Sequence, residues 1–501
     1  MKRLVFPASM LLFGLGLSQV LFTALVYVSN HRLHAELADM KAAGYLVVPN
    51  ELVMPGLLQF MPAFCGALFF TLTTGAGLSL AAFFAAWVQK RLLPGSRVYP
   101  AVLVAAWLTL LIACNLQGWN LRATIVFLLV PPAVFAAART WMPPAHAGDK
   151  HVRAVHIIVV AIAAVAWIPC LQQDVFISIR DYILLSNPAG KQVNAFYYNY
   201  TLYPANMIRP LANKLIKPCR IETGASPARY RQITGRLIAY DYLPVAEDTP
   251  SAITIRSEND RLQFAADETV LHETGLQKFL SEPGQTLKTV SMRADTNRFF
   301  RQATLYSLIG AFPLGLYIFV HAGLCLLLVF VRSVAGRGIC ASVICLGLAA
   351  AVLIPLYAGA LQSDKPSQIR AALHSESWHK QRDALKTIAD QGSSPGAYNI
   401  SPELAKSPHV PVRYWLARGL GNSKSANSRD LLKALTADPS PNVACMAYAG
   451  LGRLGGKQTV NFIENRIRSI PHWYVQQYAY NAMRQLGWKQ KRSDTRGNRL
   501  P

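Results

Sequence analysis

Long runs of apolar residues without a single charged side chain are the feature that most constrains how this chain folds. A run of about 18 or more such residues can cross a lipid bilayer as a helix, and the sequence contains several. Only 15% of the 501 residues are charged, whereas soluble domains average about 25%. We therefore interpret the chain as an integral membrane protein, with the lipid bilayer as its first partner.

Seven apolar segments fit this interpretation. They are Leu4–Val28, one crossing within Leu57–Val88, Tyr99–Leu116, Leu121–Ala138, Ala154–Leu171, Ala303–Val331 and Ile339–Leu361. The second is the hardest to delimit, because the uncharged stretch Leu52–Val88 is too long for one upright helix and barely long enough for two. Pro55, Gly56 and Pro62 favour an interfacial segment followed by a single crossing. A second crossing there would reverse the orientation of everything downstream.

Lysine and arginine in the short loops predict the orientation. With the N-terminus inside, the inner loops carry Lys2-Arg3, Lys90-Arg91-Arg97, Arg139-Lys150-Arg153 and Arg332-Arg337. Segment 172–302 and the C-terminal region then lie on the outer side. In a Gram-negative bacterium this predicts an inner-membrane protein with both of those parts in the periplasm.

The chain divides into five predicted regions. They are membrane helices one to five at 1–171, an extramembrane insert at 172–302, membrane helices six and seven at 303–361, a helical solenoid at 366–488 and a basic disordered tail at 489–501. In the insert, Arg236–Leu243 alternates as a strand does, as Ala252–Ile255 and Leu262–Phe264 do more briefly. We therefore expect a small α+β domain there. The aromatic run Phe196–Pro204 favours an interfacial anchor over a ligand-stacking surface.

An internal repeat is the most specific signal in the chain. Val412, Val443 and Val475 align at spacings of 31 and 32 residues. At offsets of four, seven and eight stand Leu416, Ala447 and Ala479, then Gly419, Gly450 and Ala482, then Leu420, Leu451 and Met483. These offsets trace one helix face, whose small residues allow a neighbour to approach closely. Helices also precede the copies, at Leu431–Leu435 and Phe462–Ile467. Helix–loop–helix units of this length predict an α-solenoid.

Two of these copies, His409–Gly421 and Asp438–Gly452, resemble short HEAT repeats of the phycobilin-lyase type, and Arg382–Ile388 is a fainter copy. The resemblance covers about residues 366–488. The Val-Arg pair of the family stands at Val412-Arg413 but not in the later copies, which removes any inherited activity. What the resemblance implies is a protein-binding solenoid rather than bilin chemistry.

The C-terminal region is also strongly basic. Residues 362–501 hold 21 lysines and arginines against 9 acidic residues, which supplies half of the chain's net charge of +24. Beside a membrane, such a solenoid suits an acidic protein partner or anionic lipid headgroups, and we do not expect nucleic acid. The candidate binding residues are basic and aromatic side chains of the solenoid and one histidine of the sixth span: Arg413, Trp415, Arg418, Arg453, Trp473, Tyr474 and His321.

The sequence carries no motif of catalysis, cofactor binding or metal binding. His272-Glu273 does not continue as HExxH, and Walker, GxSxG and glycine-rich fingerprints are missing. We therefore favour a non-enzymatic, membrane-anchored interaction or assembly scaffold. The alternative is a transporter or lipid-handling protein, which kinking prolines and His321 suggest. A third hypothesis, a membrane-bound enzyme with its site in the insert, has Arg180, Asp181, His272 and Glu273 as its candidates.

Overall fold

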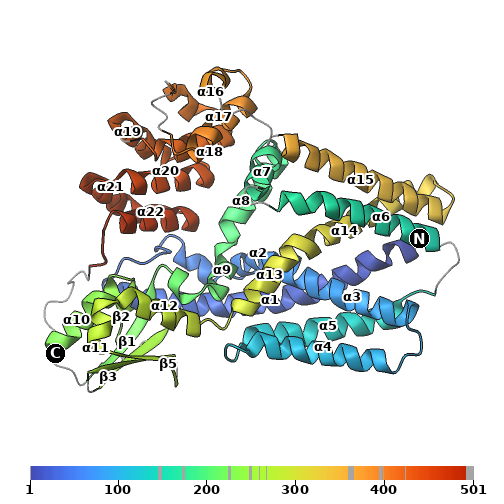
Figure 1. The fold of residues 1–501 in the computed structure, drawn as a ribbon, viewed down its shortest axis with the longest axis horizontal. Helices are drawn as coiled ribbons and strands as arrows, with labels where there is room; N and C mark the ends of the chain where they lie inside the picture. Colours follow the sequence, from blue (N-terminus) through green and yellow to red (C-terminus); the bar gives the residue numbers. More distant parts are fainter. Residues whose placement is uncertain are drawn as a thin grey trace.

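The computed structural model is mostly helical and has three parts: an apolar helical bundle, an α+β insert and a C-terminal solenoid (Figure 1). It describes residues 2–144, 149–171, 175–223, 227–246, 251–258, 260–266, 268–358, 366–393, 398, 400–423 and 425–491. Most of the predicted basic tail lies outside these residues.

The bundle is built from two stretches of the chain that the insert separates. Its first helices are α1 (Lys2–Ala42), α2 (Phe60–Phe70), α3 (Ala76–Arg91), α4 (Val98–Asn115), α5 (Leu121–Trp141) and α6 (Asp149–Trp167). After the insert follow α13 (Arg298–Tyr306), α14 (Phe312–Leu327) and α15 (Val334–Ala358). The π-helical turns η2 (Thr71–Gly75) and η6 (Ser307–Ala311) connect α2 to α3 and α13 to α14, and a 2.8 Å hydrogen bond joins Thr74 to Thr304 beside them.

Five helical segments are long and apolar enough to cross a membrane among the residues described: Leu4–Ala42, Phe60–Arg91, Leu121–Trp141, Arg298–Phe330 and Val334–Ile354. Two further apolar helices, Val98–Ala113 and Ala154–Trp167, are shorter. These seven helices are the seven segments expected from the sequence, although only five reach spanning length. The doubtful stretch after Leu52 forms a short 3-10 turn, η1 (Met54–Leu58), followed by one continuous helix through Arg91.

The two ends of the bundle differ. Figure 1 places the N-terminus and the connections from α3 to α4 and from α14 to α15 at one end. The insert and the solenoid lie at the other end, where the outer half of α1 and the turn between α4 and α5 also lie. The loops that carry the lysine and arginine clusters Lys90–Arg97 and Arg332–Arg337 therefore lie at the end opposite the insert and the solenoid. Which side of a membrane each end faces stays a prediction.

The insert begins with helices and continues into a mixed sheet. Its elements are α7 (Val175–Ile179), the π turn η4 (Arg180–Leu184), α8 (Pro188–Tyr200), α9 (Leu202–Ile208), η5 (Leu211–Asn213), β1 (Lys217–Thr223), α10 (Pro227–Ile238), β2 (Tyr242–Pro244), β3 (Ile253–Glu258), β4 (Arg261–Ala266), β5 (Thr269–Gly275), α11 (Leu276–Ser281) and α12 (Pro283–Arg293). The strand order is β2-β1-β3-β4-β5. Strand β1 runs parallel to β2 and β3, and β4 is antiparallel to β3 and β5.

The sheet corrects one prediction and confirms two. Strands β3 and β4 lie where the alternation at Ala252–Ile255 and Leu262–Phe264 predicted them. The strand expected over Arg236–Leu243 is wrong, because helix α10 continues to Ile238 and only the last residues of that stretch enter β2. The buried pair Ile233 and Leu237 lies four residues apart and faces the core as one helix face.

The solenoid consists of two layers of short helices. The inner layer is α17 (Trp378–Asp390), α18 (Val410–Leu420), α20 (Pro441–Leu454) and α22 (Trp473–Gln485), and the outer elements are α16 (Pro366–Leu373), η9 (Pro402–Lys406), α19 (Ala426–Leu435) and α21 (Lys457–Ile467). The aligned valines and the large residues eight positions later are buried, as the repeat predicted. The small residues also act as expected: a Cβ on Gly450 would lie 3.0 Å from Leu432.

Candidate functional site

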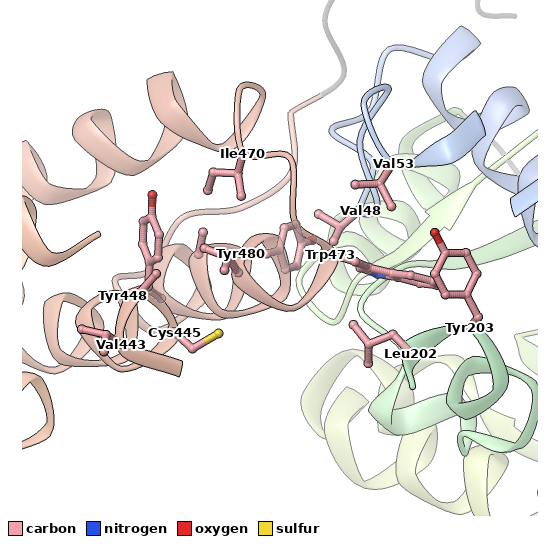
Figure 2. Packing of buried hydrophobic residues seen from close by; sticks show 14 of the residues in the cluster. Val48, Val53, Leu202, Tyr203, Val443, Cys445, Tyr448, Ile470, Trp473 and Tyr480 are labelled. Atoms are coloured by element: carbon pink, nitrogen blue, oxygen red, sulfur yellow. The ribbon is translucent and has the colours of Figure 1, made fainter. Parts of the chain in front are cut away.

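The solenoid is packed against the chain's own insert, and this contact contains the most unusual chemistry in the molecule. One hydrophobic cluster runs from α1 through the segment after it and α9 into the inner layer of the solenoid. Figure 2 shows Trp473 of α22 beside Tyr203 of α9, with Val48 and Val53 nearby. The two rings lie 5.3 Å apart, edge to face. The solenoid therefore shares a core with the rest of the protein.

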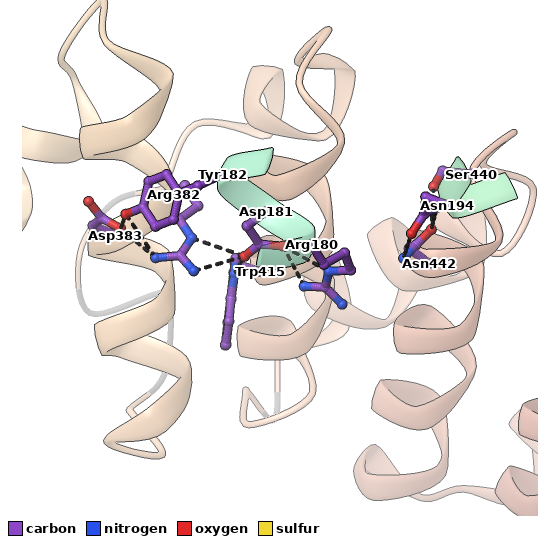
Figure 3. A network of polar contacts seen from close by, with 9 residues as sticks. All are labelled: Arg180, Asp181, Tyr182, Asn194, Arg382, Asp383, Trp415, Ser440 and Asn442. Carbon is purple, nitrogen blue, oxygen red and sulfur yellow. Dashed lines mark hydrogen bonds and ion pairs between the residues drawn. The ribbon is translucent and has the colours of Figure 1, made fainter. Parts of the chain in front are cut away.

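A buried carboxylate, Asp181 of the π turn η4, lies at the centre of this contact (Figure 3). Its side chain is 0% exposed. Arg382 of α17 donates to its Oδ2 from Nε at 3.0 Å and from Nη2 at 2.9 Å. Trp415 Nε1 of α18 donates to the same oxygen at 2.7 Å. π turns inside helices often mark functional positions, and here the turn directs a charge into the solenoid.

The charges around Asp181 balance. Arg180 donates from Nε to Oδ1 of Asp181 at 2.8 Å and lies 3.7 Å above the ring of Tyr414. Asp383 accepts from Arg382 Nη1 at 2.6 Å and from the Tyr182 hydroxyl at 2.7 Å. Two guanidinium groups thus face two carboxylates. Burial alone lowers the pKa of Arg382, but the neighbouring acidic groups raise it more, so the arginine stays charged.

Neutral polar pairs extend the contact toward the C-terminal repeats. Asn194 Nδ2 of α8 donates to Asn442 Oδ1 of α20 at 2.9 Å, and both side chains are buried. Asn50, in the segment after α1, is also held by hydrogen bonds to neutral groups. Its Nδ2 donates to the carbonyls of Ile467 and Ile470, and its backbone N–H donates to Gln476 Oε1 at 2.9 Å. Buried polar groups paired in this way fix one orientation of two packed parts.

The aromatic run Phe196–Pro204 belongs to this contact. Tyr198 lies 4.9 Å from Tyr474 of α22, and Thr201 forms a 3.0 Å hydrogen bond with the same tyrosine. Tyr203 packs on Trp473. The run was expected to anchor the chain at the bilayer surface, but its inward-facing rings cover the solenoid instead. Phe196 and Tyr197 remain exposed.

The binding residues expected in the solenoid separate into three groups. Trp415, Trp473 and Tyr474 face the insert. Arg413 forms a two-pronged ion pair with Asp438, at 2.6 and 3.0 Å, inside the solenoid. Arg418 and Arg453 lie toward the C-terminal ends of α18 and α20.

Those two arginines are the most accessible of the set. Arg453 is exposed, and its Nη2 donates to the carbonyl of Arg418 at 2.9 Å. Arg418 lies 4.8 Å above the ring of Trp415 and 3.5 Å from Asp390. Cations at helix C-termini also interact favourably with the helix dipole.

His321 lies inside the bundle. It is buried on α14, and its Nε2 lies 3.2 Å from the carbonyl of Gly338 on α15, a contact that bridges two helices. The ring of His156 on α6 lies 4.4 Å away, and its Nδ1 is 2.6 Å from the Tyr317 hydroxyl. Among the described residues, no three His, Cys, Asp or Glu side chains are placed to hold a metal ion.

The residues proposed for a membrane-bound enzyme are not brought together. Arg180 and Asp181 bind the solenoid, whereas His272 and Glu273 lie on β5, at the far side of the insert (Figure 1). Asp181 was a candidate for the enzyme hypothesis, and its carboxylate is instead bound by Arg180, Arg382 and Trp415. Its partner Arg382 is 201 residues away, and no local pattern connects the two.

Comparison with known proteins supports the solenoid. Residues 399–484 match the family of HEAT repeats, which agrees with the resemblance in that region. No curated protein and no solved structure matches the chain significantly. The C-terminal region is therefore a HEAT-repeat solenoid, a type of domain that generally mediates protein–protein interaction.

Proposed function

We propose that this protein is a membrane-anchored scaffold that holds a HEAT-repeat solenoid in one fixed orientation at the membrane surface, where it binds a partner protein. The observation that carries the proposal is the buried ion-pair cluster around Asp181. A solenoid joined through a shared core and a charge-balanced cluster has no freedom to swing on a linker. A partner bound to it is then held at a defined place relative to the bundle.

The surface of the bundle supports the membrane part of the proposal. Large apolar side chains are exposed along its helices, among them Phe13, Phe84, Val102, Ile158 and Leu348. Soluble proteins rarely expose apolar patches of this extent. In contrast, no large hydrophobic side chain is exposed among the described residues of the solenoid. This division fits a bilayer around the bundle and water around the solenoid. We propose seven crossings, with the insert and the solenoid on the outer side.

The polar surface of the solenoid indicates which partner it suits. Much of the inner layer's surface is taken up by the insert, so the partner binds elsewhere. Arg453 at the end of α20, Lys457 at the start of α21 and Arg468 just beyond α21 are all exposed. We infer an acidic protein partner, attracted by charge and held by side-chain hydrogen bonds.

The test uses the full-length chain in its native membrane. Carbonate extraction and paired phosphatase and fluorescent-protein fusions after Pro501 check the anchoring and the side. Partners are then cross-linked in membranes and recovered with the protein and with its Arg453→Glu/Lys457→Glu variant. We expect the variant to recover at least about tenfold less of the partner than the parent protein does, since it reverses two charges.

A matched variant controls for net charge. Arg236→Glu/Lys278→Glu reverses two exposed cations of the insert, outside the solenoid, and should leave the recovery of the partner unchanged. Release of the protein by carbonate would contradict the anchoring. Equal recovery by both variants would contradict the proposed binding face.

A second candidate function, transport or lipid handling by the bundle, is favoured by one observation. Three apolar helices, α6, α14 and α15, enclose a polar group in which Ser342 Oγ lies 3.3 Å from His156 Nδ1 and 3.4 Å from the Tyr317 hydroxyl. Polar and ionisable residues inside membrane helices often line a pathway. Hydrogen bonding between helices explains the same contacts, so the scaffold remains our first proposal.

A further inference from the structure

A basic pocket lies where the insert meets the end of the bundle. Its volume is about 220 Å³, and it is lined by the outer part of α1, the first turn of α5, the segment after α9 and residues next to the sheet. Four of its lining side chains are cationic: Arg32, Arg122, Arg209 and Lys214.

The pocket is lined by fewer acidic than basic side chains. Glu36 lines the pocket and pairs with Arg32 at 3.1 Å. Asp295 also lines the pocket but is already bound through both oxygens by Arg301. Three of the four cations are therefore left without a carboxylate among the described lining residues.

The cations make few bonds within the protein. The side chains of Arg209 and Lys214 are half-buried and form no hydrogen bond or ion pair within the described part of the chain. Arg122 Nη1 donates one long hydrogen bond of 3.4 Å, to the carbonyl of Met207. The polar ends of these side chains are thus available to a ligand.

The cations also lie close enough to affect one another's pKa. Burial lowers the pKa of Lys214, and the three arginines lower it further against the opposing effect of Glu36. Burial also lowers the pKa of Arg209. Half-buried like charges are costly to hold together, and such clusters are common at binding sites.

We infer that this pocket binds a phosphate group, carried either by a lipid headgroup or by a soluble phosphate. Arginine and lysine are the side chains that bind phosphate oxygens best, through charge-assisted hydrogen bonds. A cavity needs only about 10–15 Å³ to hold one water molecule, so about 220 Å³ accommodates a phosphate and its first substituents.

The position of the pocket explains why a lipid headgroup could supply the phosphate. Ser29, a lining residue, directly follows the uncharged run Leu4–Val28, and Arg122 is the second residue of α5. The pocket thus lies where apolar helices end, which is headgroup level if the bundle spans a membrane. Only this lipid source rests on the proposed membrane placement; phosphate binding itself does not.

The test measures ligand-dependent thermal stability of the full-length protein. In neutral detergent, inorganic phosphate is titrated against chloride at equal ionic strength. In a second arm, nanodiscs of phosphatidylcholine are compared with nanodiscs that also contain phosphatidylglycerol, and bound lipid is counted by native mass spectrometry. Stabilisation by inorganic phosphate assigns a soluble phosphate, and selective retention of the anionic lipid assigns a headgroup.

Two variants decide whether the pocket is responsible. Arg209→Gln/Lys214→Gln should weaken binding of the effective probe at least about tenfold, or about 1.4 kcal/mol. Arg236→Gln/Lys278→Gln removes two exposed charges of the insert outside the pocket and should weaken it less than about twofold.

The unliganded pocket variant supplies an independent check on folding. Because it removes like-charge repulsion, it should melt at or above the temperature of the parent protein. A lower melting temperature would mean that the cations hold the fold together, and would overturn the inference. So would the absence of stabilisation by either probe, or an equal response of both variants.

Discussion

Replacing Asp181 by asparagine is the sharpest perturbation of the contact between the solenoid and the insert. The substitution keeps the size of the side chain and removes its charge. Asp181 is 0% and Arg382 is 3% exposed in their side chains, so the two arginines would keep only Asp383 as a buried counter-charge. Removing one partner of a buried ion pair costs about 3–5 kcal/mol. We expect a loss of this size in the free energy that holds the solenoid on the insert.

Thermal unfolding of the full-length protein, followed by tryptophan fluorescence, measures this loss. Trp415, one of nine tryptophans in the chain, donates its Nε1–H to Asp181 at 2.7 Å, so part of the emission comes from the site itself. A loss of 1 kcal/mol lowers Tm by about 2–4 °C in a unit of 150–250 residues. Asp181→Asn should therefore lower Tm by on the order of 10 °C. Glu403→Gln, which breaks an exposed ion pair with Lys406, should change it by less than about 2 °C.

A double-mutant cycle shows whether the loss comes from the ion pair itself. Combining Asp181→Asn with Arg382→Met removes both charges, and the combined loss should be smaller than the sum of the single losses by at least about 1 kcal/mol. Additive losses would refute the proposed coupling. A Tm of Asp181→Asn within about 2 °C of the Glu403→Gln control would refute the larger claim that this cluster holds the solenoid in place.

Three further predictions concern other parts of the molecule. Burial lowers the pKa of His472 from its ordinary 6.5 to about 4. The free energy of unfolding should therefore keep its full value above pH 6.5 and fall by up to about 3 kcal/mol as the pH drops to 4, because the unfolded chain takes up the proton first. Melting measured against pH should show this slope, and His472→Phe should remove it. Gly421→Ala would place a Cβ 2.8 Å from the Gly450 Cα and should destabilise the solenoid by about 1–3 kcal/mol, whereas Gly235→Ala, which meets nothing within 4 Å, should be neutral or stabilising in the same denaturation assay. His321→Ala should lower the free energy of unfolding by about 1–3 kcal/mol in a melting experiment and leave partner recovery intact. Loss of function in a variant that still folds would favour the transport hypothesis.

The sequence predicted the features that depend on neighbouring residues. The apolar runs and the repeat at Val412, Val443 and Val475 both arise from patterns within one helix or one repeat unit. The stretch after Leu52 was predicted in its favoured form, a short lead segment and one helix. Helix α10 was missed because alternation over a few residues does not distinguish a strand from the end of an amphipathic helix.

The functional contacts depend on residues far apart in the chain, which explains why they were not predicted. Asp181 meets Arg382 and Trp415 only after the solenoid folds back over η4. The basic pocket likewise draws Arg32, Arg122 and Lys214 from three separate elements. Such juxtapositions leave no periodicity or spacing in the sequence. Trp415 was selected for its chemistry as a binding residue, and its partner proved to be within the same chain.

The most direct test of the central claim is a cross-link between the insert and the solenoid in intact membranes. Tyr197 of α8 and Tyr474 of α22 stack with their ring centroids 6.4 Å apart, and Tyr197 is exposed. Tyr197→Cys/Tyr474→Cys should therefore be joined by a short thiol cross-linker, and mass spectrometry should find the linked peptides. The single variants control for the native cysteines. A fixed, membrane-held solenoid predicts near-complete cross-linking in the membrane fraction. Cross-linking no greater than in the single variants, with the protein folded and membrane-bound, would contradict it.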